Sequence, residues 1–183
     1  MKTTLLNYVE SQASRFRQLA GLSDSEAVNL RSLLLKLNVL TLFRPMSDSF
    51  SGMSLKGNGR LFMLINSNQP RCRQHFTISH ELYHLFIEDN PVPHRCQEGG
   101  KKNESEQCAD AFALMFLMPA DAVRQMIPED ELKKGKVSLA TSLKLGQYFG
   151  TSHAAVLNRL SDLNLIGRNE REIIRNFREK SLP

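Results

Sequence analysis

Hydrophobic residues recur with a helical period in the first part of the chain. Residues 3 to about 20 form one such segment, with Leu5, Leu6, Val9, Phe16 and Leu19 as predicted buried positions. Gly21 then interrupts the pattern, and Ser23 or Asp24 can cap a second helix that ends near Leu37 and Asn38. The chain therefore begins with two amphipathic helices.

The pattern changes to that of strands after residue 38. The stretch "VLTLFRP" is short and strand-like, and apolar segments follow on both sides of Lys56, Gly57, Asn58 and Gly59. A four-residue group of this composition is a strong turn signal, so we expect a β-hairpin whose second strand covers about Arg60 to Ile65.

Helical periods return and continue to the end of the chain. They predict one helix from about residue 71 or 73 to 88 and, after a Pro- and Gly-rich loop, another from about 104 to 117. A charged linker leads to residues 136–167, which read as helix, turn at Gly150, helix and stop at Gly167, and a charged tail occupies 168–183. The predicted fold class is α+β: a mostly helical domain with a small antiparallel sheet and a C-terminal helix-turn-helix-like segment.

Composition narrows the functional classes only modestly. The chain has 183 residues, 41% of them hydrophobic, which suits one compact domain with a small appendage. Its longest apolar run, Phe112 to Met118, is too short to span a bilayer, and the N-terminus lacks the apolar centre of a signal peptide. A net charge of +5 permits contact with nucleic acid without requiring it. The three cysteines are expected to be reduced, and the expected compartment is the cytoplasm.

The stretch "HELYH" carries the chemistry of the sequence. His80 and His84 are four residues apart, so on a helix they share one face and can bind one ion. Zn²⁺ accepts neutral histidine nitrogens, and Glu81 can reach a water at such a site as a general base without ligating the metal. The alternative is a pair of core histidines satisfied by hydrogen bonds. Burying both histidines and Glu81 in an apolar helix without a partner would be costly, which favours the metal.

A catalytic zinc site needs a third protein ligand. The candidates downstream are His94, Cys96, Glu98, Glu104, Glu106, Cys108 and Asp110. Glu106 is favoured because it begins a helix long enough to pack against the first one. Glu104 is the alternative ligand, although an acid at that position also suits the helix N-terminus.

Asp110 lies one turn beyond Glu106 on the same helix face. A carboxylate there can accept the N–H of a ligating histidine and fix its tautomer. The alternative for Asp110 is an ordinary carboxylate on the helix surface.

Two blocks together, "RQHFTISHELYHLF" and "ESEQCADAFALMFLMPADAV", resemble the ImmA/IrrE family of metallo-endopeptidases over roughly residues 60 to 165. The second block matches the family pattern at Glu106, Ala109, Asp110, Phe112, Ala113, Leu117, Met118 and Pro119. The resemblance implies zinc at His80 and His84, Glu81 as the base, Glu106 as the third ligand, and a gluzincin-like fold whose sheet edge binds substrate. The hairpin near Met63 and Ile65 is the expected edge strand.

The charged linker "PEDELKKGK" gives the domain organisation that we expect: residues 1–127 as the metallopeptidase core and residues 136–167 as a helix-turn-helix-like segment. The resemblance implies that this segment packs on the core, and it also implies a partner. Relatives typically cleave a repressor of the helix-turn-helix class in mobile elements, stress responses or anti-phage operons. The basic charge balance also leaves single-stranded DNA open as an activating ligand, and no membrane is expected. The larger radiation-response members carry a sensor domain, for which this chain is too short.

Several roles stay open at this stage. The C-terminal segment either binds DNA through Ser152, His153, Asn158 and Arg159 or forms a lid on the core. Cys96, in the loop between the two metal helices, either is idle or supplies a thiolate that silences the zinc site. The candidate oxyanion stabilisers are Tyr148, His153 and His75.

The main rival function is a DNA-binding regulator with a structural or inert zinc site. A second rival is a zinc hydrolase that acts on small molecules.

Overall fold

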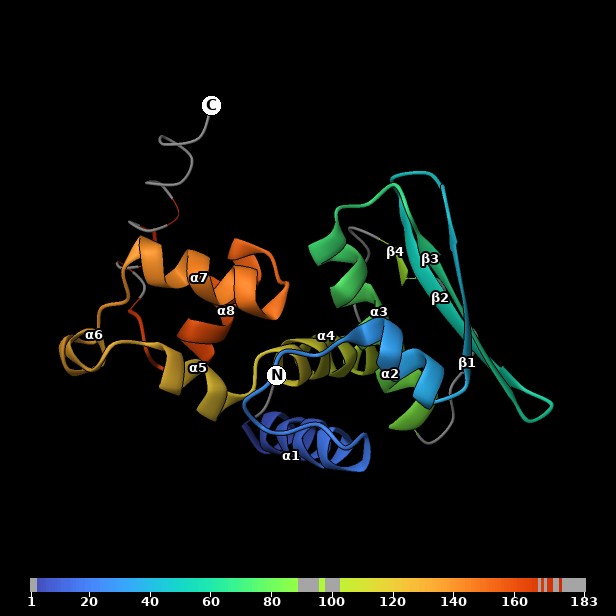
Figure 1. Cartoon of the computed structure of the whole chain (residues 1–183), viewed down its shortest axis with the longest axis horizontal. Helices are drawn as coiled ribbons and strands as arrows, with labels where there is room; N and C mark the ends of the chain where they lie inside the picture. Colours follow the sequence, from blue (N-terminus) through green and yellow to red (C-terminus); the bar gives the residue numbers. More distant parts are fainter. Residues whose placement is uncertain are drawn as a thin grey trace.

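The computed structural model describes residues 3–88, 96–97, 103–167, 169, 171, 172 and 175. A mixed sheet lies at one end, the helices α1, α3 and α4 form the middle, and the last helices lie at the other end (Figure 1). In chain order the elements are α1 Thr3–Leu19, α2 Leu30–Lys36, β1 Val39–Arg44, β2 Phe50–Gly57, β3 Arg60–Asn66, α3 Arg71–Phe86, β4 Cys96–Gln97, α4 Glu104–Leu117, α5 Ala120–Met126, α6 Glu129–Lys134, α7 Leu139–Phe149 and α8 His153–Asp162. The α+β class predicted from the sequence is confirmed.

The sheet differs from the predicted antiparallel one. The hairpin is present, with β2 antiparallel to β3 around Asn58 (φ 49°) and Gly59 (φ 70°), as a tight turn with two left-handed residues requires. However, β1 pairs with β3 in parallel, and the strand order is β1-β3-β2-β4. Met63 and Ile65 therefore lie in a central strand and are fully buried, so the expectation that they mark the edge strand is wrong.

The predicted second helix is shorter than expected at its start. It begins at Leu30, where Asn29 Oδ1 accepts a hydrogen bond from Ser32 N (3.1 Å). Ser23, predicted to cap this helix, instead lies in a local turn. Ser23 N donates to Glu26 Oε1, and Glu26 N donates to Ser23 Oγ. The carbonyls of this turn are bound by Arg17 Nη2, so a capping sequence stabilises a turn here.

The core joins α1, α3 and α4. Phe16 of α1 meets the rings of Phe86, Phe112 and Phe116 at centroid distances of 5.4–5.9 Å. Leu19, predicted to be buried, is 75% exposed, whereas Arg17 is 1% exposed and donates to the Phe116 carbonyl at the end of α4 (2.8 Å). This packing fixes α4 beside α3, which is the relation that the site depends on.

The C-terminal helices contact this core through two of the side chains that were considered for DNA binding from the sequence. Arg159 is 2% exposed and binds the Met118 carbonyl (2.9 Å) and Glu10 (2.7 Å). His153 is buried against Ser142 (3.1 Å). Neither side chain can reach a DNA groove from these positions.

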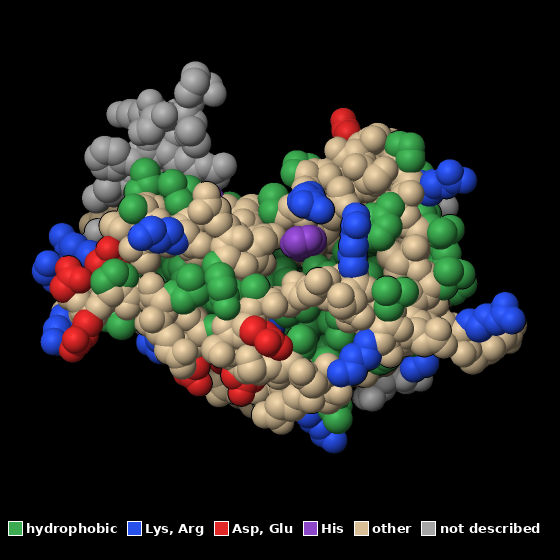
Figure 2. Space-filling model, viewed as in Figure 1, with side chains coloured by type: hydrophobic (Ala, Val, Ile, Leu, Met, Phe, Trp, Pro, Cys, Tyr) green, Lys and Arg blue, Asp and Glu red, His purple; other side chains and the backbone are tan. Residues whose placement is uncertain are grey.

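The charges near α6 are of both signs, as the left side of Figure 2 shows, and pair as Glu129–Lys133 and Asp130–Lys134.

The division of the chain at residues 127 and 136 stays a prediction. Within the described residues, no helix has both the length and the hydrophobicity that a membrane span requires.

Candidate metal centre

Helix α3 carries three polar side chains into the interior. His80 and Glu81 are fully buried and His84 is 2% exposed. They lie on a helix segment that is buried continuously from Thr77 to Leu85. Hydrophobic neighbours such as Leu82 hold the helix against the core, so these three side chains have fixed positions.

Helix α4 brings Glu106 to the two histidines. Asn103 caps this helix, and its Oδ1 accepts from the backbone N of Glu106 (2.8 Å), which fixes the first turn. Glu106 Oε2 lies 3.4 Å from His80 Nε2, and Glu106 Oε1 lies 3.5 Å from His84 Nε2. The two Nε2 atoms are 3.3 Å apart. One carboxylate thus faces both ring nitrogens.

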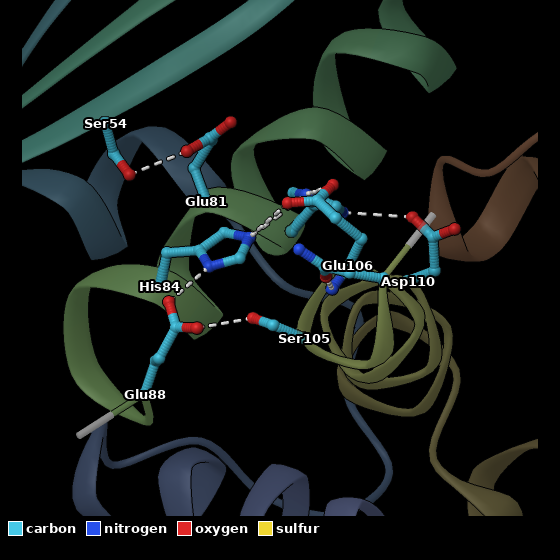
Figure 3. A network of polar contacts seen from close by, with 9 residues as sticks. Ser54, Glu81, His84, Glu88, Ser105, Glu106 and Asp110 are labelled. Atoms are coloured by element: carbon cyan, nitrogen blue, oxygen red, sulfur yellow. Dashed lines mark hydrogen bonds and ion pairs between the residues drawn. The ribbon is translucent and has the colours of Figure 1, made fainter. Parts of the chain in front are cut away.

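Two further carboxylates hold the outer nitrogens of the same rings (Figure 3). His80 Nδ1 faces Asp110 Oδ1 at 3.0 Å, and His84 Nδ1 faces Glu88 Oε2 at 2.7 Å. Ser105 Oγ donates to the other oxygen of Glu88. Carboxylates only accept, so each Nδ1 carries the hydrogen, and when the ring is neutral its lone pair is on Nε2, which faces inward.

The inner side of the cluster is therefore made of acceptors. The Nε2 lone pairs of His80 and His84 and the carboxylate of Glu106 converge on one point, where they would repel one another unless a cation or shared protons lay between them. Three donors about 2.0–2.1 Å from one tetrahedral ion are about 3.3–3.4 Å apart. The separation of 3.3 Å between the two Nε2 atoms matches that geometry, and each of these nitrogens has one oxygen of Glu106 at 3.4 or 3.5 Å. Two imidazoles and one carboxylate that converge in this way fit Zn²⁺.

Glu81 lies beside this cluster and is held from the sheet. Ser54 of β2 donates its hydroxyl to Glu81 Oε2 at 2.6 Å (Figure 3). A short hydrogen bond to a buried carboxylate fixes its orientation. The strand that borders the site is therefore β2.

Reasoning from the sequence missed Glu88, Ser105 and Ser54. The contact of Glu88 with His84 could have been predicted, because Glu88 lies four residues after His84 and so on the same helix face. No sequence pattern predicts the contact of Ser54 with Glu81, since only the pairing of β2 in the sheet brings the two side chains together.

Other candidates for metal binding are not brought to this cluster. Cys108 lies in the core against Tyr83, where burial raises the pKa of its thiol, and it is not part of the cluster of His80, His84 and Glu106. His94 and Glu98 lie outside the described residues.

Cys96 was expected in a loop but forms β4, where it pairs with Gly52 of β2. Its side chain is outside the described part of the chain, so its inhibitory role stays a prediction.

The three candidate oxyanion stabilisers make contacts away from the cluster. His75 Nδ1 donates to the Gly150 carbonyl (3.1 Å), Tyr148 donates to the Ser25 carbonyl (3.3 Å), and His153 meets Ser142. These contacts support structural roles for the three side chains.

Comparison with known proteins gives the family of the chain and a protein of similar fold. The model of the IrrE N-terminal-like domain, an M78 peptidase family, matches residues 35–161, and the chain belongs to this family. A Mycobacterium tuberculosis transcriptional regulator has a similar fold, with a TM-score of 0.56 and 16% identity over 85% of this chain. The chain spans 46% of that regulator's length. No curated protein matches the sequence significantly.

Proposed function

We propose that the protein is a zinc-dependent endopeptidase that cleaves a partner repressor of the helix-turn-helix class. The observation that carries the proposal is the convergence of His80, His84 and Glu106, with Glu81 fixed beside them. Membership of an M78 peptidase family supports a protein substrate. The repressor is proposed because this family includes metallopeptidases that cleave repressors.

The residues of the chain divide the work between binding and proton transfer. His80, His84 and Glu106 would hold Zn²⁺, which supplies Lewis-acid polarisation of the scissile carbonyl and acidifies a water. Asp110 and Glu88 keep both rings in the tautomer that leaves Nε2 able to bind. Glu81 takes a proton from the attacking water and passes it to the leaving amine, while Ser54 keeps the carboxylate oriented.

A Glu81→Gln variant tests the proposal. It keeps the shape of the side chain but removes the base, so cleavage of the repressor should fall by about 10²–10⁴-fold while bound zinc is unchanged. The substrate is a helix-turn-helix repressor encoded beside the gene, mixed with the zinc-loaded enzyme and analysed by mass spectrometry of the fragments. Glu129→Gln is the matched control, since Glu129 is an exposed carboxylate on α6.

Two results would contradict this assignment. Full cleavage by the Glu81→Gln protein would remove Glu81 from the role of base. Regulation of the repressor's operon with no cleavage by either protein would favour a DNA-binding regulator instead.

A further inference from the structure

A hollow of about 460 Å³ lies between α2, β1 and the start of α3, apart from the metal centre. Arg71, Gln74, His75 and Ile78 line it from α3, and their spacing places them on one face of that helix. Arg71 precedes His80 by about two and a half helical turns, so the two side chains leave α3 on opposite sides. None of the three proposed metal ligands lines the hollow.

The wall of this hollow carries unbalanced positive charge. Arg31 comes from α2 and Arg71 from the first turn of α3, and both side chains are exposed. Among the described residues that line the hollow, none is acidic, and the ion pairs described elsewhere in the chain include neither arginine. A cation at the N-terminal end of a helix is unfavourable, and the first turn of α3 has no acidic residue to offset Arg71. An anion in the hollow would relieve this repulsion.

Arg31 and Arg71 both lie close to the His75 ring. Burial is the main cause that lowers the pKa of His75, the Gly150 carbonyl opposes it, and the charges of Arg71 and Arg31 lower it further. The guanidinium carbon of Arg31 is 5.9 Å from the centroid of the Phe43 ring, which also lines the hollow. Figure 2 shows a histidine between basic side chains on this face of the molecule, where Figure 1 draws the start of α3. The two charges therefore belong to one site.

The rest of the lining is apolar or neutral. Leu30 and Ile78 are buried and Phe43 is partly buried, while Asn29 and Gln74 supply amide groups. A hollow of this volume falls within the range of small-molecule sites. Inorganic phosphate would occupy only a small part of it, whereas a nucleoside attached to the phosphate would cover the apolar side chains. Amides can both donate and accept hydrogen bonds, which suits the polar edge of a nucleobase.

We propose that this hollow binds a nucleoside monophosphate, with the phosphate between Arg31 and Arg71 and the base against Phe43 and Ile78. Arginine suits the phosphate because its planar guanidinium group donates two parallel hydrogen bonds. The proposal does not depend on the proposed peptidase function, since the lining shares no residue with the three proposed metal ligands.

Isothermal titration calorimetry of the zinc-loaded protein with AMP, GMP, CMP and UMP tests the proposal. At least one of them should bind at a single site, about tenfold or more tightly than inorganic phosphate and than its own nucleoside. Arg31→Gln and Arg71→Gln should each weaken this binding by about tenfold to a hundredfold, because each removes a charge-assisted contact with the phosphate. Arg15→Gln is the matched control and should bind as wild type does, since Arg15 is an exposed arginine on α1.

His84→Ala shows whether the phosphate binds in the hollow or on a zinc ion. This variant lacks a proposed metal ligand but keeps the whole lining, so it should bind the nucleotide with wild-type affinity. Loss of binding in His84→Ala, equal weakening in Arg15→Gln, or full affinity in both Arg31→Gln and Arg71→Gln would overturn the proposal. So would equal affinity for inorganic phosphate and the nucleotides. Binding of single-stranded oligothymidylate by a protein that binds none of the four monophosphates would overturn it as well.

Discussion

Glu88 and Asp110 accept hydrogen bonds from the two histidines of the candidate metal centre. Each carboxylate faces the Nδ1 of one histidine, at 2.7 and 3.0 Å, and so decides which ring nitrogen is left to bind an ion. Their side chains are 23% and 28% exposed, so solvent screens them only partly. At the scale of single residues, we therefore expect these two carboxylates to tune the zinc affinity that the three proposed ligands provide.

Replacing Glu88 with Gln should weaken zinc binding by about tenfold or more, because the neutral amide no longer polarises His84. Competition with a chromophoric chelator measures the affinity. Glu129→Gln, at an exposed carboxylate, should leave the affinity at the wild-type value. An unchanged affinity in Glu88→Gln would show that the contact with His84 is incidental.

At the scale of elements, α3 and α4 were predictable, whereas of the sheet only the hairpin was. The period of apolar residues and the cap at Asn103 define α4 as Glu104–Leu117, and "HELYH" can present both histidines only on a helix. The hairpin followed from its turn residues. The parallel pairing of β1 with β3 depends on contacts between segments that are distant in sequence, and so does the burial of Arg17. Local patterns carry no information on such pairings.

The same limit explains which residues of the candidate site were foreseen. His80, Glu81 and His84 share a motif, and Glu106 and Asp110 share a helix face, so spacing alone brings each group together. Ser54 reaches Glu81 only because β2 lies along α3. A contact between a strand and a helix has no fixed spacing in the sequence.

Gly150, between α7 and α8, is the element-scale link between the C-terminal helices and α3. Its φ is +64°, and a Cβ there would lie 2.7 Å from His75 Nδ1. Gly150→Ala should therefore destabilise the fold by about 2–3 kcal/mol, from left-handed strain plus the displaced histidine.

Gly135→Ala is the matched control for this substitution. Gly135 has nearly the same φ, +61°, but nothing lies within 4 Å of a Cβ there, so only about 1–2 kcal/mol of strain is expected. Urea denaturation of both variants measures the difference. Equal losses of stability would mean that His75 moves aside at no cost.

At the scale of the whole molecule, His75 makes stability depend on pH. Burial is the main cause that lowers the pKa of His75, the Gly150 carbonyl opposes it, and Arg71 and Arg31 lower it further. The unfolded chain then binds a proton at a higher pH than the folded protein does. Stability from this group is fully present above about pH 6.5 and is lost as the pH falls toward the lowered value.

The difference between the free energies of unfolding of wild type and His75→Gln, followed as a function of pH, isolates the contribution of His75. Glutamine can donate to the Gly150 carbonyl but does not titrate, so the variant should lose less stability than wild type between pH 6.5 and 5. Denaturant unfolding across this range, at equal metal content, gives both curves. Parallel curves would contradict the assignment, since every other titrating group is shared.

A bound ion would also tie together parts of the molecule that fold from distant segments. His80 and His84 come from α3 beside the sheet, and Glu106 comes from α4 beside α1. An ion that needs all three ligands is therefore bound only by the folded protein. Zinc at 100 times its dissociation constant should therefore raise the free energy of unfolding by about 2.7 kcal/mol, or the melting temperature by about 5–10 °C. Thermal unfolding with and without zinc measures the shift. It should vanish in His84→Ala, which lacks a proposed ligand, and persist in Glu81→Gln, which lacks only the proposed base. Loss of the shift in Glu81→Gln would make Glu81 a ligand, and the division of the site into metal holders and a separate base would then be wrong.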